Sequence, residues 1–218
     1  AIASGFPGSW SGVEDFNNAS LDNSGNWIAT ANGGPHNIEA SADNELNTPF
    51  NLTNPKEFNG VTYNSGDPKF AIAAGLFNST METPAFSTVG MSSAVFSFQH
   101  AFNLNAGAII KVEISIDGGA TYQSVPLFQA VGPTSLGTPN LGFVTTYLDL
   151  SNYLGQSTLK IRFNYQGSAG SNWAIDNAGL QLPPVPLTYA WTLTDPAGVP
   201  SPYYLNATDQ ATVRAGPP

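Results

Sequence analysis

Apolar and polar residues alternate with a period of two in several segments of this 218-residue chain, and the pattern limits the folds it can adopt. Successive side chains of a β-strand point to opposite faces, so the alternation predicts strands with one buried face. Apolar residues spaced as in an amphipathic helix are not sustained over three turns anywhere in the sequence. Glycine, proline and Asn-Gly pairs interrupt the alternation at short intervals, as turns between strands do. The sequence therefore predicts an all-β fold.

The clearest alternation lies in residues 110–116, IKVEISI, and 158–165, TLKIRFNY. The side chains expected to point inward there are Val112, Ile114, Ile116, Leu159, Ile161, Phe163 and Tyr165. Residues 94–102, AVFSFQHAF, predict a half-buried strand whose phenylalanines share one face with His100. Further apolar segments lie at 69–77, 143–150 and 172–182. Together they supply the strands of a two-sheet antiparallel jelly-roll sandwich.

A domain boundary is predicted at residues 183–186, PPVP, because such a run cannot occupy a central strand and favours an extended spacer. Residues 1–182 are then one domain. Residues 183–218 form a Pro-rich linker and a short C-terminal β extension, too short to bury a core of its own. We therefore expect the chain to be a fragment of a larger multi-domain protein.

The charge balance excludes polyanions as partners. Lys and Arg number 6 against 15 Asp and Glu, which gives a formal net charge of −9. Nucleic acid would be repelled by such a chain. The absence of cysteine also removes disulfides, thiolate metal sites and cysteine nucleophiles.

An extracellular setting is expected from the low charged fraction of 10% and the abundance of Asn, Gly, Ser and Thr. No apolar run approaches the ~18 residues that a membrane helix needs, so we expect no membrane insertion in this segment. The first residues, AIASGFPGSW, have neither a basic region nor an apolar signal core. Any export signal is expected to have been removed.

Residues 114–122, ISIDGGATY, lie close to the Ser-x-Asp-x-Gly-x-Thr-Trp pattern of the sialidase Asp-box. The Asp-Gly-Gly turn supplies the positive φ angles of a tight hairpin, and Asp117 can accept bonds from turn amides. A sialidase propeller would need several copies and an arginine cluster, whereas the chain has one copy and two arginines. The motif is predicted to form a hairpin without a catalytic role.

Catalytic groups are scarce. Glu39, Asp43 and Glu45 are the nearest candidates for a glycosidase acid pair, but they lie in a segment poor in strand-forming residues and favour a solvated loop. His36 lies in a turn and His100 among phenylalanines, so neither forms a nucleophilic triad. We predict that the domain is not an enzyme.

Structural calcium is the chemical function that the sequence favours, because hard cations bind clustered carboxylate and amide oxygens on loops. Asp22, Ser24 and Asn26 alternate as in the first half of a calcium loop, and an ordinary Asx-turn explains them equally well. Asp176 lies in the otherwise apolar WAID and needs a cation or amide partners. The predicted metal ligands are Glu14, Asp15, Asp22 and Asp176.

The order of the motifs VED, SSAVFSFQHAF, VEISIDGGATY and LKIRFNYQGSAGSNWAIDNAGL resembles the MAM-like jelly-roll modules of bacterial surface proteins, the cleaved-adhesin or choice-of-anchor group of Bacteroidetes. The resemblance covers most of residues 10–182. It implies a jelly roll with structural calcium held by Glu14 or Asp15 together with Asp176. The segment YAWTL after the linker resembles the start of a PKD or immunoglobulin-like repeat.

The resemblance implies a non-catalytic adhesion module of a large secreted or cell-surface protein, serving surface attachment or gliding motility. Its expected partner is an extracellular glycan or a surface protein. Trp10, Tyr122 and Tyr153 are the aromatic side chains that the sequence offers for glycan binding, with burial in the core as the competing interpretation. An accessory domain of a secreted protease or glycosidase is the alternative function.

Overall fold

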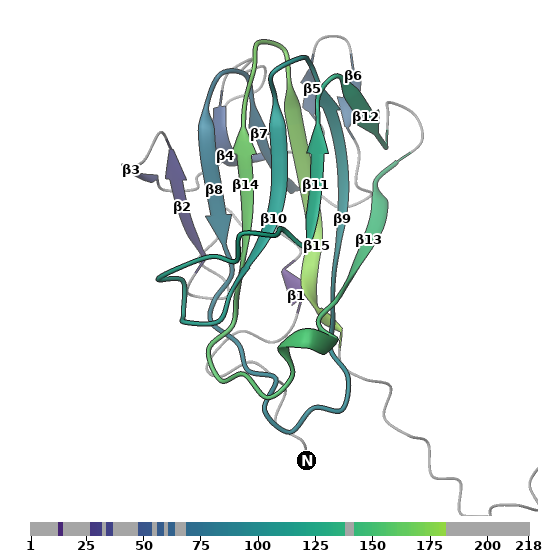
Figure 1. Cartoon of the computed structure of the whole chain (residues 1–218). Coiled ribbons are helices and arrows are strands. Elements are labelled where there is room, and N and C mark those ends of the chain that lie inside the picture. The colour runs from purple at the N-terminus through teal and green to yellow at the C-terminus, as the bar shows by residue number, and fades with distance from the viewer. Residues whose placement is uncertain are drawn as a thin grey trace, which may run out of the picture. The chain divides into compact units, whose positions relative to one another are not determined.

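The computed structural model describes residues 13–14, 27–31, 34–36, 48–53, 56–58, 61–63, 69–137 and 142–181. In these ranges all strand pairing is antiparallel, and a single 3-10 turn, η1 (Ser151–Tyr153), is the helical element (Figure 1). The strands are β1 (Val13–Glu14), β2 (Ile28–Ala31), β3 (Gly34–His36), β4 (Thr48–Thr53), β5 (Lys56–Phe58), β6 (Val61–Tyr63), β7 (Phe70–Ala74), β8 (Asn78–Glu82), β9 (Val95–Leu104), β10 (Ile109–Ser115), β11 (Phe128–Val131), β12 (Thr134–Leu136), β13 (Val144–Asp149), β14 (Lys160–Gln166) and β15 (Asn172–Gln181). The predicted all-β, two-sheet jelly-roll class is confirmed.

The chain divides into two compact units, residues 1–183 and 184–218. Every described residue belongs to the first unit. The predicted linker and the PKD-like segment lie outside the described residues, so their structure stays a prediction.

The described strands form three sheets, of which two make the sandwich and the third is the β5-β6 pair. The first sheet of the sandwich has the strand order β11-β10-β14-β8-β2-β3 and is called the six-stranded sheet. Its central strands β10 and β14 pair over seven residues, from Ile109 opposite Gln166 to Ser115 opposite Lys160. β14 also pairs with β8, which sets Arg162 between Glu113 and Glu82 on one face. Charged and polar side chains therefore line up across the outer face of this sheet.

The second sheet has the order β12-β9-β15-β7-β4, with β13 also on β9 and β1 also on β15, and is called the seven-stranded sheet. β9 and β15 pair with each other and each has two successive partners on its other edge. On β15 the partners are β7 at residues 172–175 and β1 at residues 178–179. A bulge lies between these two pairings, where Asn177 adopts a positive φ of 48°.

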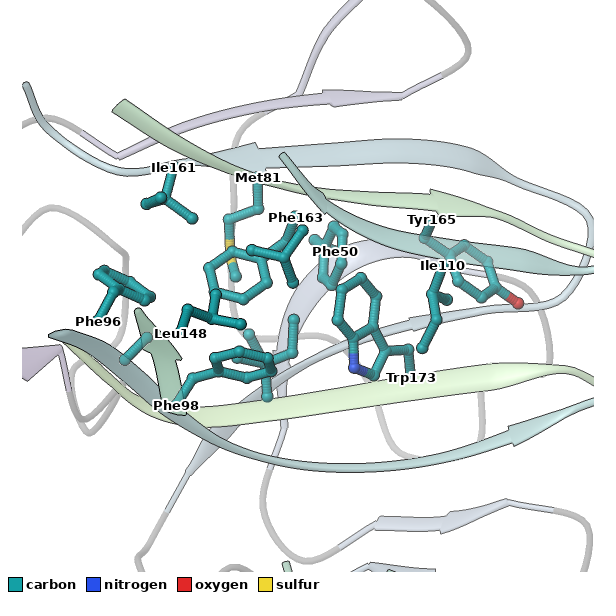
Figure 2. Close-up of a cluster of buried hydrophobic side chains, with 14 of the residues drawn as sticks. Phe50, Met81, Phe96, Phe98, Ile110, Leu148, Ile161, Phe163, Tyr165 and Trp173 are labelled. Atoms are coloured by element: carbon teal, nitrogen blue, oxygen red, sulfur yellow. The ribbon is translucent and has the colours of Figure 1, made fainter. Parts of the chain in front are cut away.

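The main core fills the space between the two sheets (Figure 2). The Phe163 ring lies at its centre, with its centroid 5.2 Å from Phe98 and 5.7 Å from Trp173. Trp27 stacks on the same ring at 6.3 Å. Edge-to-face and stacked contacts of this kind stabilise a core beyond the area that they bury. The aromatic side chains of the alternating segments thus join the two sheets.

A smaller apolar cluster covers part of the outer face of the seven-stranded sheet. It consists of Tyr63, Phe70, Ile72, Ala74, Ala101 and Ala174, with Phe143 packed against it. Tyr63 donates a hydrogen bond to Oδ1 of Asn172 at 2.6 Å. Because of this cover, β7 is buried on both faces, which explains its nearly continuous apolar sequence.

The predicted facing of the alternating segments is confirmed with one exception. Leu159, Ile161, Phe163 and Tyr165 are fully buried, as are Val112 and Ile114. Ile116, predicted to point inward, is 40% exposed. β10 ends at Ser115, and the chain turns away before the alternation would bring Ile116 into the core.

Candidate ligand-binding surfaces

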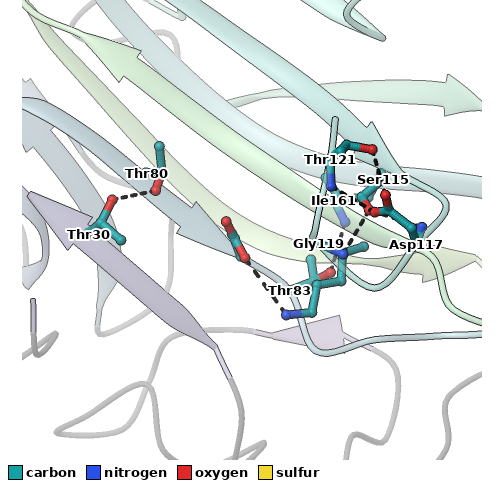
Figure 3. A network of polar contacts seen from close by, with 10 residues as sticks. Thr30, Thr80, Thr83, Ser115, Asp117, Gly119, Thr121 and Ile161 are labelled. Atoms are coloured by element: carbon teal, nitrogen blue, oxygen red, sulfur yellow. Dashed lines mark hydrogen bonds and ion pairs between the residues drawn. The ribbon is translucent and has the colours of Figure 1, made fainter. Parts of the chain in front are cut away.

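The Asp-box-like segment forms a closed turn held by its own side chains (Figure 3). Oδ1 of Asp117 accepts hydrogen bonds from the Ser115 hydroxyl at 2.7 Å and from the Thr121 amide at 2.9 Å. Oδ2 accepts the Thr121 hydroxyl at 2.6 Å, and the amide of Gly119 donates to Oγ of Ser115. The bonds from Thr121 lower the pKa of Asp117 to about 2. Asp117 therefore fastens a turn, as the sequence predicts.

Arg162 on β14 is fixed on the outer face of the six-stranded sheet. Its Nε and Nη2 both lie 2.8 Å from Oε2 of Glu113. The same oxygen accepts a bond from Nδ2 of Asn164 at 3.1 Å. The ring of Tyr122 lies against the guanidinium, 3.6 Å from ring centroid to Cζ, in a cation-π contact. The loop that follows β10 is thereby fastened to the sheet through Tyr122.

Burial and neighbouring charges both act on the hydroxyl of Tyr122. Burial raises the pKa of its hydroxyl, and the carboxylate of Glu82 adds to the effect. Lys160 forms an ion pair with Glu82 at 3.8 Å. Tyr122 is half-buried and one face of its ring is taken by Arg162, so the ring has a structural contact of its own.

His100 is a core residue, as its sequence setting predicts. Its Nδ1 accepts a hydrogen bond from the Trp173 indole at 3.3 Å, so Nε2 carries the proton and donates to Oγ1 of Thr146 at 2.8 Å. Burial lowers the pKa of His100 to about 4. The imidazole is therefore neutral at physiological pH, with both nitrogens bonded.

Asp176 lies on β15 at the start of the bulge and is 0% exposed. Its Oδ1 accepts a hydrogen bond from the Asn177 amide at 2.8 Å. β1 pairs with β15 just beyond the bulge, which sets Glu14 opposite Ala178. The backbone register thus places two of the predicted calcium ligands, Glu14 and Asp176, on neighbouring strands two residues apart. Asp15 and Asp22 lie outside the described residues.

The predicted aromatic ligands do not form one surface in the described residues. Tyr153 lies in η1, half-buried, and packs against the main core. Tyr122 packs on Arg162 at the outer face of the six-stranded sheet. Trp10 lies outside the described residues. As binding residues, all three stay predictions.

One exposed aromatic side chain was missing from the predicted set. Tyr147 on β13 is 68% exposed. Its neighbours in sequence, Thr146 and Leu148, face the core side, because Thr146 bonds His100 and Leu148 is buried. The alternation of TTYLDL therefore carries the signal that the tyrosine points outward.

The described residues hold few groups able to perform acid-base or metal chemistry. Every acidic side chain that the structure describes has a contact within the protein; these are Glu82, Glu113, Asp117, Asp149 and Asp176. In the described part of the chain, no group of three or more His, Cys, Asp or Glu side chains could hold a metal ion. Within those same ranges, no helix has the length and apolar character to cross a membrane.

No protein-family model matches the sequence, and no curated protein matches it. Solved structures do match. The K1 cleaved adhesin domain of Lys-gingipain from Porphyromonas gingivalis W83 superposes with a TM-score of 0.53 at 12% identity, over 78% of this chain and 97% of that one. The chain has the fold of a cleaved adhesin domain.

Two other solved structures match at lower TM-scores. The K2 cleaved adhesin domain of Lys-gingipain gives 0.48 at 11% identity, over 78% of this chain and 98% of the other. TmCBM61, solved in complex with β-1,4-galactotriose, gives 0.47 at 12% identity, over 78% of this chain and 95% of the other. The match to the K1 domain confirms the fold that the cleaved-adhesin resemblance implies, while the MAM-like label and the PKD-like repeat stay predictions.

Proposed function

We propose that residues 1–182 are a non-catalytic module that binds extracellular glycans for a secreted or cell-surface protein. The observation that carries the proposal is the commitment of the described acid and base groups to structural contacts. Asp117 fastens its turn, Glu113 pairs with Arg162, and His100 is neutral inside the core. A hydrolase needs a carboxylic acid or imidazole in reach of substrate with a pKa tuned to its task.

Surface attachment is the role that this binding would serve. The cleaved-adhesin fold supports it, since the matching domain of Lys-gingipain is an adhesin domain by name. The resemblance read from the motifs adds gliding motility as a setting and a PKD-like repeat after residue 186 as the next module. The net charge of −9 favours neutral glycans over acidic ones as the ligand.

Calcium would act as a structural ligand at the bulge of β15. Asp176 is a buried carboxylate, and β1 sets Glu14 opposite Ala178, two residues beyond Asp176 on β15. Burying a carboxylate is costly unless hydrogen bonds or a cation compensate for it. A divalent cation held by Glu14 or Asp15 with Asp176 would join the N-terminal strand to the last strand, and Asp22 remains the candidate for a second cation.

The proposed function is tested by offering the whole chain a panel of soluble β-1,4-galactan, xylan and mixed-linkage β-glucan. Binding is measured by retardation in polysaccharide-containing native gels, and turnover by release of reducing ends. We expect retardation by at least one neutral polysaccharide and no release of reducing ends above a blank. Release of reducing ends by purified protein would contradict a non-catalytic role, and lack of retardation by all three would contradict glycan binding.

A further inference from the structure

The outer face of the seven-stranded sheet carries an exposed aromatic side chain between polar neighbours. Thr145, Tyr147 and Asp149 alternate with inward residues along β13 and are all exposed. β9 sets Gln99 opposite Thr145 and Ser97 opposite Tyr147. Residues directly opposite in an antiparallel pair share a face, so these side chains form one surface.

The third strand of this surface is β15, which lies on the far side of β9. Gln181 is opposite Val95, and Val95 is opposite Asp149 on β13. Across the strands, Asp149, Val95 and Gln181 therefore form one row of neighbouring residues. Tyr147 and Ser97 form the next row, and Thr145 and Gln99 form the row after that. We call the five side chains Thr145, Tyr147, Asp149, Gln99 and Gln181 the Tyr147 platform.

The amides of the platform are held in place. Nε2 of Gln181 donates to Oγ of Ser97 at 2.6 Å, and Oε1 of Gln99 accepts from Nδ2 of Asn177 at 3.3 Å. The other amide groups, Oε1 of Gln181 and Nε2 of Gln99, have no partner among the described residues. One acceptor and one donor are thus left for a ligand. Their side chains are already held by hydrogen bonds, so ligand binding would cost little side-chain entropy.

Asp149 adds a second fixed acceptor. Its Oδ1 accepts hydrogen bonds from the amide and the hydroxyl of Ser151, and these bonds lower the pKa of the carboxyl. The group is therefore ionised at neutral pH. Oδ2 of Asp149 has no hydrogen-bond partner in the described ranges.

The chemistry of the platform selects its ligand. A tyrosine ring has a negative face that attracts the C–H groups on the apolar face of a pyranose ring, while the amides and the carboxylate pair with its hydroxyls. Lys111, Lys160 and Arg162 lie on the six-stranded sheet, so these cations do not face an acidic sugar on the platform. A single aromatic ring with polar neighbours also lacks the apolar core of a protein interface.

We propose that the Tyr147 platform is the glycan subsite of this module and that it binds neutral pyranose chains. The inference rests on the proposed function and locates it on the seven-stranded sheet. It places the predicted aromatic residues Tyr122 and Tyr153 outside the ligand contact.

The test compares Tyr147→Ala, Tyr147→Phe and the control Val125→Ala in native gels containing β-1,4-galactan, xylan or mixed-linkage β-glucan, with polygalacturonate as the acidic comparator. Val125 is an exposed apolar residue, 74% accessible, in the loop after β10. Both replaced side chains, Tyr147 and Val125, are exposed, so the thermal midpoints of the three variants should match that of the parent protein. Loss of a tyrosine anchor from a binding site costs at least about tenfold in affinity.

We expect at least one neutral polysaccharide to retard the parent protein, Val125→Ala and Tyr147→Phe, and to retard Tyr147→Ala at least about tenfold less in apparent affinity. Equal retardation of Tyr147→Ala overturns the platform and leaves the proposed function standing. Stronger binding to polygalacturonate than to any neutral chain overturns the choice of ligand. Retardation by none of the neutral polysaccharides overturns both the platform and the proposed function.

Discussion

The guanidinium of Arg162 is enclosed between two side chains, the carboxylate of Glu113 at 2.8 Å and the ring of Tyr122 at 3.6 Å from its centroid. The contact joins β14 to the loop after β10. It gives the outer face of the six-stranded sheet a structural role, in contrast to the exposed tyrosine of the seven-stranded sheet.

Glu113→Gln should destabilise the fold by about 1–3 kcal/mol, because it leaves the partly buried Arg162 without its charged partner. The measurement is the free energy of unfolding from urea titration. Lys111→Gln, on the same face of β10, is the matched control and should change stability by less than about 0.5 kcal/mol. Equal effects of the two substitutions would show that the Arg162 contact adds nothing to stability.

Phe163→Ala should cost about 3–5 kcal/mol, since the ring is fully buried and contacts rings from both sheets. A cavity at this point cannot be filled without moving Phe98 or Trp173. Val125→Ala should be close to neutral in the same urea titration. A loss below about 1 kcal/mol for Phe163→Ala would mean that the core is packed differently.

Stability should fall on acidification because of His100. The pKa of His100 is about 4 in the folded state against 6.5 for an ordinary histidine, so the unfolded chain binds more protons between these values. The contribution is complete above the unfolded pKa and is lost as the pH falls toward about 4. Between pH 7 and pH 5 the expected loss is about 2 kcal/mol.

The His100→Gln variant isolates this effect, because it retains His36 and every carboxylate of the parent chain. Its stability should depend on pH between 7 and 5 by about 2 kcal/mol less than that of the parent protein. Parallel pH profiles for the two proteins would contradict a neutral, doubly bonded His100.

Asp117→Ala should open the turn after β10 without unfolding the domain. The amide of Thr121 loses its acceptor and should exchange with deuterium faster, while amides of β14 should keep their protection. Thr121→Val, which removes only the hydroxyl contact, should have a smaller effect on the same amide. Unchanged exchange at Thr121 in Asp117→Ala would contradict the turn geometry.

Calcium binding at the β15 bulge should raise the thermal midpoint. A cation bound only by the folded state stabilises it by linkage, so millimolar calcium should shift the midpoint of EDTA-treated protein by several degrees. Asp176→Asn should abolish the shift, and Asp149→Asn should retain it as a matched exposed acid. Identical thermal midpoints in EDTA and in calcium would contradict the proposed metal site.

The fold was predictable because alternation reports burial directly where one face of a strand is covered. Ile161, Phe163 and Tyr165 follow this rule and are buried. The prediction failed at Ile116, where a turn ends the strand before the pattern does. The turn held by Ser115 and Asp117 was likewise predictable from the sequence, because its hydrogen bonds join residues at most four positions apart.

The surfaces were harder to predict, since exposure depends on what other segments cover. Tyr122 reads as an exposed loop aromatic, yet Arg162, 40 positions away in the printed sequence, occupies one face of its ring. The alternation around Tyr147 indicates that its side chain points outward, but only the pairing of β13 with β9 shows that Ser97 lies opposite it. Long-range pairing of this kind leaves no local signal in the sequence.

The central claim is that a neutral glycan binds on the Tyr147 platform, and an NMR titration tests it most directly. Oligosaccharides from the polysaccharide that retards the protein are added to the isotope-labelled chain, and backbone amide shifts are followed. We predict that the largest changes occur at Tyr147, Ser97 and Gln181 on the seven-stranded sheet. Changes concentrated around Tyr122 and Arg162 on the six-stranded sheet would contradict the account.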